Sequence, residues 1–446
     1  MSGMLPLTTA EEPFECRVTS YGGRGLFATK PIPADTLLRT CPAPYAAAIY
    51  APFRKEVCAH CFAYAFDAGR NTWNIKHDAS PGSRFCSAAC LEDWSRERDL
   101  NLLARVEKAI HALAKSSVKR PATPVLPTLD LSGATPAATM QAIDEAWQVA
   151  ERLPVKDGAL VLDEMEEEIL RFVLSAFLRR HAEDTADPVQ DAAHPVEDAT
   201  SSAEDTARAV VGASNPAEDT SFSANATSSI IKATSGATAN LVVPTQNTNP
   251  AGSWAAFLAL QDNEAAHVRA RLAILATHIR VWLFARLALL SAPERRAHGG
   301  APERREHGGG PEWREASAAR GADVGIPELS AYVRTPATLR AVLARDHANA
   351  FGIFDAQEAG ESEMLGWAVY PAGSYFNHDC APNVRKQRAG RTLRFLTTRA
   401  VAAGAELCIS YVDTADGRTA RRALCREHWG FECVCKRCQE EGEEEG

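Results

Sequence analysis

The sequence predicts an α+β fold in which short strands from both ends of the chain pair around a helical middle. Segments with strand-like alternation, bounded by glycine and proline, occur in residues 14–50 and again in residues 324–412. The stretches between them, such as 96–180 and 253–290, carry apolar residues at helical spacing. Neither strand region has enough strands for a sheet with its own core, so we expect the two regions to pair with each other.

The remaining segments differ sharply in composition from these strands and helices. Residues 181–252 are rich in Ala, Asp, Thr and Ser, and residues 291–323 contain a nine-residue repeat. We interpret both as disordered inserts, because such compositions bury too little apolar surface to offset chain entropy. Residues 51–95 form a cysteine-containing finger, residues 413–438 a second cysteine-rich segment and residues 439–446 an acidic tail.

Length and charge exclude several classes of protein. The 446 residues, 46% of them hydrophobic, are enough for more than one domain and at least one substantial core. A net charge of −9, without a basic stripe around the cysteines, argues against direct nucleic-acid binding. The most apolar stretch, 272–290, contains His278, Arg280 and Arg286, so we expect a buried helix there and no membrane association.

Most of the 12 cysteines gather in two parts of the chain. One group is Cys58-x2-Cys61 followed by Cys86-x3-Cys90, and the other contains Cys425, Cys433, Cys435 and Cys438. The N-terminal residues 1–15 have no basic region followed by an apolar run, so no secretory signal is predicted. Close cysteine pairs in such a chain indicate metal binding in a reducing compartment, and we expect the protein in the cytoplasm, the nucleus or both.

Four motifs contain the residues suited to chemistry. They are Tyr21-Gly-Gly-Arg-Gly-Leu-Phe27, Asn377-His-Asp-Cys-Ala-Pro-Asn383, Glu406-Leu-Cys-Ile-Ser-Tyr411 and Trp429-Gly-Phe-Glu-Cys-Val-Cys-Lys-Arg-Cys438. Glycines at 23 and 25 allow a tight turn and the close approach of a ligand to the backbone. By itself, however, the first motif also fits a solvated hairpin turn, and Tyr411 also fits an ordinary strand-end tyrosine.

Taken together and in this order, the four motifs resemble the SET-domain protein-lysine methyltransferases. The finger between the first motif and the others is similar to that of the branch with a MYND-type finger (SMYD-like), especially its shorter fungal members. The resemblance covers residues 14–95 and 325–438. It implies a split SET β-fold with an inserted MYND-like zinc finger, a helical insert and a zinc-bound post-SET segment. The implied activity is S-adenosylmethionine-dependent methylation of a lysine in a histone or non-histone protein, by a monomer.

The resemblance also implies roles for single residues. It assigns cofactor binding to Arg24, Gly25, Asn349, Asn377, His378 and Phe431, and catalysis to Tyr411. Phe431 would cover the adenine ring, with Trp429 as the weaker candidate, and the Tyr411 hydroxyl would orient the attacking amine. A rival interpretation is a catalytically silent adaptor that keeps the zinc-stabilised fold and binds proteins.

Two zinc ions are expected in all. Cys58, Cys61, Cys86 and Cys90 supply four thiolates for a tetrahedral ion. The second cysteine pair of a MYND finger is missing, so we predict one zinc there, with His60 and His77 outside the ligand set. Cys433, Cys435 and Cys438 are too few for a closed site, and the resemblance assigns the fourth ligand to Cys380. Cys425 is the competing fourth ligand.

Overall fold

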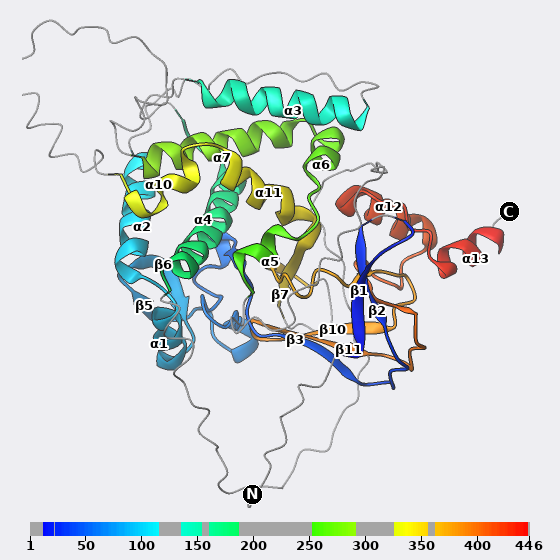
Figure 1. Ribbon diagram of the computed structural model, residues 1–446. Helices are drawn as coiled ribbons and strands as arrows, with labels where there is room; N and C mark the ends of the chain where they lie inside the picture. The colour runs from blue at the N-terminus through cyan, green and yellow to red at the C-terminus, as the bar shows by residue number, and fades with distance from the viewer. Residues whose placement is uncertain are drawn as a thin grey trace, which may run out of the picture.

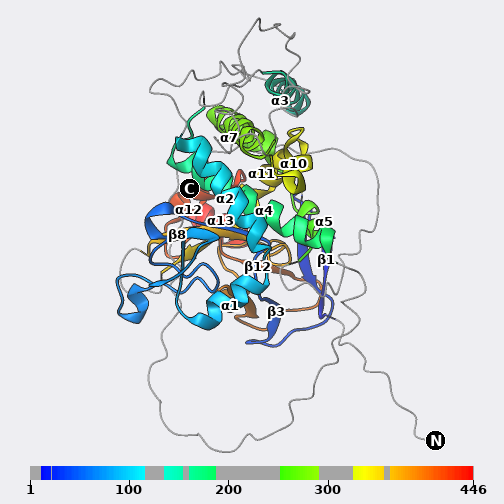
Figure 2. The same cartoon turned by 90° about the vertical axis from the view of Figure 1, so that its left-hand side faces the viewer.

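The computed structural model describes residues 12–21, 23–115, 135–153, 160–186, 252–290, 325–355 and 362–444. Apart from residues 181–186 and 252, the two predicted inserts lie outside the described residues. Most helices gather on one side of the molecule and most strands on the other (Figure 1, Figure 2).

The strands of the two ends of the chain are combined in common sheets. Their bounds are β1 Phe14–Val18, β2 Arg24–Ala28, β3 Leu37–Cys41, β4 Ala46–Ile49, β5 Ile75–His77, β6 Ser80–Phe85, β7 Ala350–Phe354, β8 Met364–Val369, β9 Asn377–His378, β10 Val384–Ala389, β11 Thr392–Thr397 and β12 Glu406–Ile409. They form sheets in the orders β1-β2-β12-β9, β10-β11-β3, β4-β8-β7 and β5-β6. The first three sheets each join early strands to late ones, so the expected α+β fold with paired strand regions is confirmed.

The helices lie mainly between β6 and β7, and two more follow β12 in the described part of the chain. Their bounds are α1 Ala88–Arg96, α2 Leu100–Lys115, α3 Pro136–Glu151, α4 Glu164–Thr185, α5 Trp254–Leu258, α6 Glu264–Ala270, α7 Ala273–Leu289, α10 Pro327–Val333, α11 Ala337–Asn349, α12 Arg418–Trp429 and α13 Lys436–Glu444, with 3-10 turns at Ala51–Phe53 and Phe66–Ala68. Asp163 and Glu166 form a capping box that begins α4, and this helix continues past residue 180 to Thr185.

Helix α7 contains the most apolar stretch of the chain and is buried among the other helices. Its two arginines have hydrogen-bond partners: Arg280 Nε donates to Glu166 Oε1 at 2.7 Å, and Arg286 Nη1 donates to the Glu151 carbonyl at 3.0 Å. Among the residues that the structure describes, no helix is long and apolar enough to cross a membrane. The expectation of a buried helix is therefore confirmed.

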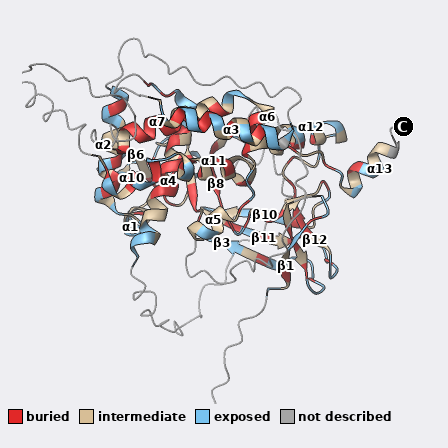
Figure 3. Ribbon diagram, turned by 45° about the horizontal axis from the view of Figure 1, so that its top comes forward, coloured by how far each residue is buried: buried red, intermediate tan, exposed pale blue. Residues whose placement is uncertain are grey.

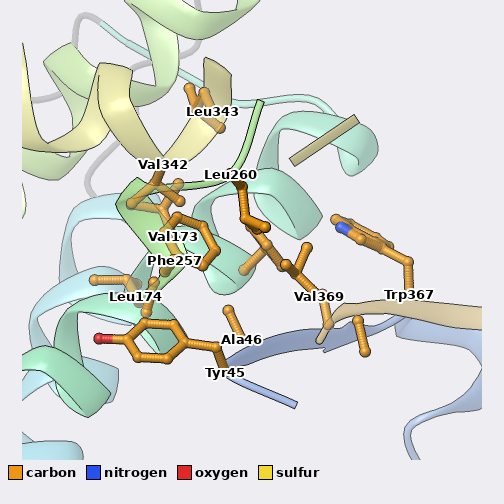
Figure 4. Close-up of a cluster of buried hydrophobic side chains, with 14 of the residues drawn as sticks. Tyr45, Ala46, Val173, Leu174, Phe257, Leu260, Val342, Leu343, Trp367 and Val369 are labelled. Atoms are coloured by element: carbon orange, nitrogen blue, oxygen red, sulfur yellow. The ribbon is translucent and has the colours of Figure 1, made fainter. Parts of the chain in front are cut away.

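The main hydrophobic core lies between the β4–β8 sheet and the helices above it. Tyr45 and Val369 on the sheet side face Val173 of α4, Phe257 of α5 and Val342 of α11 (Figure 4). Buried residues run along α4, α7 and α11, and the exposed residues of these helices lie near the helix ends (Figure 3). This core fixes the end of α11 and the start of β7, which border the candidate site.

The cysteine finger has a smaller core of its own. Strands β5 and β6 pack on α1, with Trp73, Phe85 and Trp94 buried together with Cys58. The finger lies on the opposite side of the molecule from α12 and α13 (Figure 1). A change in the finger is therefore separated in space from the C-terminal segment.

Candidate active site and metal centres

The second motif (377–383) and the third motif (406–411) pair with each other through strand β12. Strand β9, which contains Asn377 and His378, runs parallel to β12. The Asn383 side chain closes the same loop, since its Nδ2 donates to the Glu406 carbonyl and its Oδ1 accepts from the Cys408 N–H, both at 2.8 Å. The asparagine that ends the second motif therefore fixes the strand that leads to Tyr411.

The first motif joins this arrangement through Asn377. Asn377 Nδ2 donates to the Arg24 carbonyl at 3.1 Å and to Glu406 Oε1 at 2.8 Å, and the Tyr21 hydroxyl donates to the same Oε1 at 2.5 Å. A Cβ added at Gly25 would lie 2.6 Å from Asn377 Nδ2 and closer still to Glu406. The space that glycine provides at 25 is thus filled by side chains of the protein itself.

His378 connects the candidate catalytic tyrosine to the C-terminal cysteines. Its Nδ1 accepts from the Tyr411 N–H at 3.0 Å, and its Nε2 lies 3.3 Å from Cys380 Sγ. Burial lowers the pKa of His378 to about 4, so the ring is neutral at physiological pH. With Nδ1 as acceptor, Nε2 carries the proton and donates to the cysteine sulfur.

Tyr411 borders a cavity, and its hydroxyl group makes one hydrogen bond. Its hydroxyl donates to the Phe376 carbonyl at 2.9 Å. Burial raises the pKa of this phenol above its ordinary value, so Tyr411 stays protonated at neutral pH. The ring of Trp429 lies 5.2 Å from that of Tyr411, and the ring of Phe431 lies 6.4 Å away, edge-on.

The cavity beside Tyr411 has five aromatic residues in its lining. Its lining includes Phe351, Phe354, Phe376, Tyr411 and Trp429, together with Asn349, Ser374, Ile409, Val412 and Lys386. Asn349 ends α11 and is buried, and its Nδ2 donates to the carbonyls of Gln261 at 3.1 Å and Arg345 at 2.8 Å. The predicted cofactor residue Asn349 and the predicted catalytic Tyr411 therefore line one cavity.

Arg24, which was predicted to bind the cofactor, contacts other residues of the protein in this structure. Its guanidinium donates to the Ala259 carbonyl and lies over the Tyr375 ring, 5.1 Å from the ring centre. Gln261 of the same α5–α6 connection approaches Gly23, where a Cβ would lie 2.9 Å from Gln261 Oε1. Arg24 thus ties strand β2 to this connection, and its assignment as a cofactor contact remains a prediction.

Several residues at this site were not singled out from the sequence. Glu406 links Tyr21 to Asn377, Gln261 borders the glycine-rich motif, and the Phe376 carbonyl anchors Tyr411. Glu406 belongs to a motif that was recognised, but only the fold shows its partners.

The finger cysteines are arranged as one metal site. The sulfur atoms of Cys58, Cys61, Cys86 and Cys90 all lie within 4.8 Å of one another. The chain turns at Phe62, whose φ of 63° is left-handed, and the backbone N–H of Cys90 donates to Ser87 Oγ at the start of α1. Four thiols at these separations suit a tetrahedral zinc ion, and His60 and His77 are outside the group, as predicted.

The C-terminal cysteines form a second site with Cys380. The sulfurs of Cys380, Cys433, Cys435 and Cys438 also lie within 4.8 Å of one another. Cys425 is fully buried nearby but is not part of this group. The structure therefore brings Cys380 of the second motif to the three C-terminal cysteines, whereas Cys425, the competing fourth ligand, lies outside this group.

Comparison with known proteins decides the family. The model of the SET domain matches residues 23–412. The chain belongs to the SET domain family. The resemblance to its MYND-containing branch is also confirmed, as is the split fold with cysteine groups suited to zinc in the finger and in the post-SET segment.

Three curated relatives illustrate the similarity. The chain is 40% identical over 105 residues to the yeast (Saccharomyces cerevisiae) "Potential protein lysine methyltransferase SET6". The matched segment covers 23% of this chain and 28% of the yeast protein. It is 31% identical over 99 residues to a "SET and MYND domain-containing protein" of Dictyostelium discoideum, and the match covers 22% of this chain and 25% of that protein. It is 37% identical over 91 residues to mouse (Mus musculus) "Histone-lysine N-methyltransferase SMYD3", covering 20% of each. The matched segments thus span only about a quarter of these relatives.

Proposed function

We propose that this protein is an S-adenosylmethionine-dependent protein-lysine N-methyltransferase that holds two zinc ions. The observation that carries the proposal is the aromatic cavity with Asn349 in its lining and the Tyr411 hydroxyl fixed on the Phe376 carbonyl. The names of the relatives as lysine methyltransferases support the same reaction class.

The lining of this cavity fits a sulfonium cofactor. Aromatic faces and carbonyl oxygens attract cationic and polarised methyl groups, and five aromatic residues occur in the lining. S-adenosylmethionine supplies a methyl group activated on a sulfonium when it is bound. Asn349 and the loop with Asn377 and His378 are the groups that would hold it.

The residues of the chain then have to position a lysine amine and exclude water. Tyr411 is a neutral phenol whose proton is already donated to Phe376, so its oxygen lone pairs are available to accept from the amine. The rings of Phe351 and Trp429 narrow the cavity around the amine. Removal from water lowers the pKa of the substrate lysine, which favours the neutral nucleophile. The partner is a protein with an accessible lysine, in the cytoplasm, the nucleus or both.

Two measurements test this function. Titration calorimetry with S-adenosylmethionine should show binding to the purified protein, whereas a silent adaptor with a collapsed pocket should show none. Incubation of a proteome extract with isotope-labelled cofactor, followed by mass spectrometry, should then show labelled methyl groups on lysine side chains. Binding without any transfer to lysine would contradict the proposed reaction.

A further inference from the structure

Arg421 of α12 is a fully buried cation beside the C-terminal cysteines. The residue is 0% exposed, although arginine is almost never buried to this extent without partners. Its guanidinium is held by two groups: Nη1 donates to the Asp416 carbonyl, and Nη2 donates to Glu441 Oε2 at 2.5 Å. The same Nη2 also donates to Cys438 Sγ, at a distance of 3.9 Å. The fold therefore places a positive charge directly against one of the four sulfur atoms.

The second metal site needs such a charge. Cysteines bind zinc as thiolates, so a zinc ion with four of them carries a net negative charge. Cys380, Cys433 and Cys438 are buried, and this charge is therefore poorly hydrated. His378 donates to the sulfur of Cys380, but its ring is neutral. Arg421 supplies a positive charge, and a charged donor makes a stronger hydrogen bond to a thiolate than a neutral one does.

Glu441 of α13 orients Arg421 and a second arginine at the same time. Its Oε2 accepts from Arg421, and its Oε1 accepts from Arg437 Nε at 2.7 Å. Arg437 Nη1 donates in turn to the carbonyls of Cys380 at 3.0 Å and Thr414 at 2.9 Å. The Glu441 side chain is 29% exposed and that of Arg421 is 1% exposed, so water screens the carboxylate more than the guanidinium. Glu441 therefore cancels only part of the charge that Arg421 presents to the sulfur atoms.

We propose that Arg421 is a positioning residue of the C-terminal metal site that raises its affinity for zinc, and that Glu441 orients it. The proposal rests on the two zinc ions of the proposed function and not on methyl transfer. Groups that hydrogen-bond to metal ligands change the affinity of a site by about 10- to 100-fold when they are removed. Because Cys380 follows Asn377 and His378 in one loop, Arg421 acts on this loop through the zinc ion.

The test measures how the full-length protein loses zinc to a chromogenic chelator over a range of chelator concentrations. Two reference variants assign the signal of each ion. Cys58→Ser keeps the four ligands of the C-terminal site, and Cys433→Ser keeps the four ligands of the finger. The apparent zinc affinity of each site in the wild type follows from the comparison.

Arg421→Met should weaken zinc binding at the C-terminal site by about 10- to 100-fold and leave the finger ion unchanged. Arg421→Lys keeps a positive charge but lacks the planar fork that reaches both Glu441 and Cys438, so its loss should be smaller. Glu441→Gln leaves the guanidinium in place and should also cause a smaller loss. The matched control is Arg426→Met, since the Arg426 side chain lies on the same helix and is 54% exposed.

Equal zinc affinity of the C-terminal site in Arg421→Met and Arg426→Met would overturn the role of Arg421. Equal weakening of both zinc ions in Arg421→Met would also overturn it, because that result indicates a general loss of stability. Unchanged affinity in Glu441→Gln would reject Glu441 as the orienting group. A wild type without zinc at the Cys380 group would reject the metal site itself, and with it this proposal, whereas lysine methylation tests the proposed reaction separately.

Discussion

The sulfur of Cys380 lies 3.5 Å from the sulfur of Cys438, although 58 residues of sequence separate them. Cys380 is two residues after His378, and Phe431 is two residues before Cys433 of the same metal group. One metal ion would therefore fix both the loop with Asn377 and His378 and the segment proposed to cover the adenine.

Replacing Cys380 by serine should weaken the binding of S-adenosylmethionine by about tenfold or more, because the loop and the cover lose their common anchor. The control is Cys58→Ser, which disturbs the finger on the opposite side of the molecule (Figure 1). Calorimetric titration of both variants measures the effect. If Cys380→Ser binds the cofactor as tightly as the parent, the shared anchor is not required.

The protein should contain two zinc ions per chain, one for each group of four thiols. Elemental analysis of protein purified without chelator measures this ratio. Cys58→Ser and Cys433→Ser should each reduce it by about one ion, because a three-ligand remnant binds zinc more weakly. A wild-type ratio near one or zero would contradict the two-site assignment.

Gly25→Ala should lower the free energy of unfolding by about 1–3 kcal/mol, since the new methyl group overlaps Asn377 and Glu406. Gly82→Ala is the matched control, because no atom lies within 4 Å of the position of its Cβ. Chemical denaturation compares the two variants. Equal stability of both would show that the close packing at Gly25 is not needed.

The strand regions, the helical regions and most of the metal ligands can be predicted from the sequence because each depends on residues that are close together in the chain. Strand and helix regions follow from periodicity, and three of the four ligands at the C-terminal site follow from close cysteine spacing. The fourth, Cys380, required the family resemblance. The contact between Tyr21 and Glu406 spans 385 residues, and no local pattern contains such a contact. The contact of Gln261 with Gly23 likewise emerges only once distant strands and helices are side by side.

Acid should destabilise the protein through His267 and His278, which are buried, and His347, which is half-buried. Burial lowers the pKa of His278 and His347 to about 4 and that of His267 to about 2, and the rings of His267 and His347 lie 4.2 Å apart. An unfolded histidine has a pKa near 6.5, so the unfolded state binds more protons between these values. The stability due to the neutral rings is present above about pH 6.5 and is lost as the pH falls below it.

Each of these histidines should contribute a loss of up to about 1.4 kcal/mol per pH unit below pH 6.5. Denaturation curves at pH 7, 6 and 5 measure the slope. His278→Leu should reduce the slope of stability against pH by the contribution of up to one bound proton, about 1.4 kcal/mol per pH unit. His111→Gln, at an exposed position of α2, should leave the slope unchanged. The same slope in His278→Leu and in wild type would show that His278 does not remain neutral.

The most direct test of the proposed function is the methylation rate of Tyr411→Phe, measured by mass spectrometry with isotope-labelled S-adenosylmethionine and a proteome extract. The variant loses only the hydroxyl that donates to the Phe376 carbonyl at 2.9 Å, so the fold and cofactor affinity should be retained. Lysine methylation should fall by about 10²-fold or more, because the amine is no longer oriented in the transition state. Lysine methylation at the wild-type rate by Tyr411→Phe, or no lysine methylation by the wild type, would contradict the account.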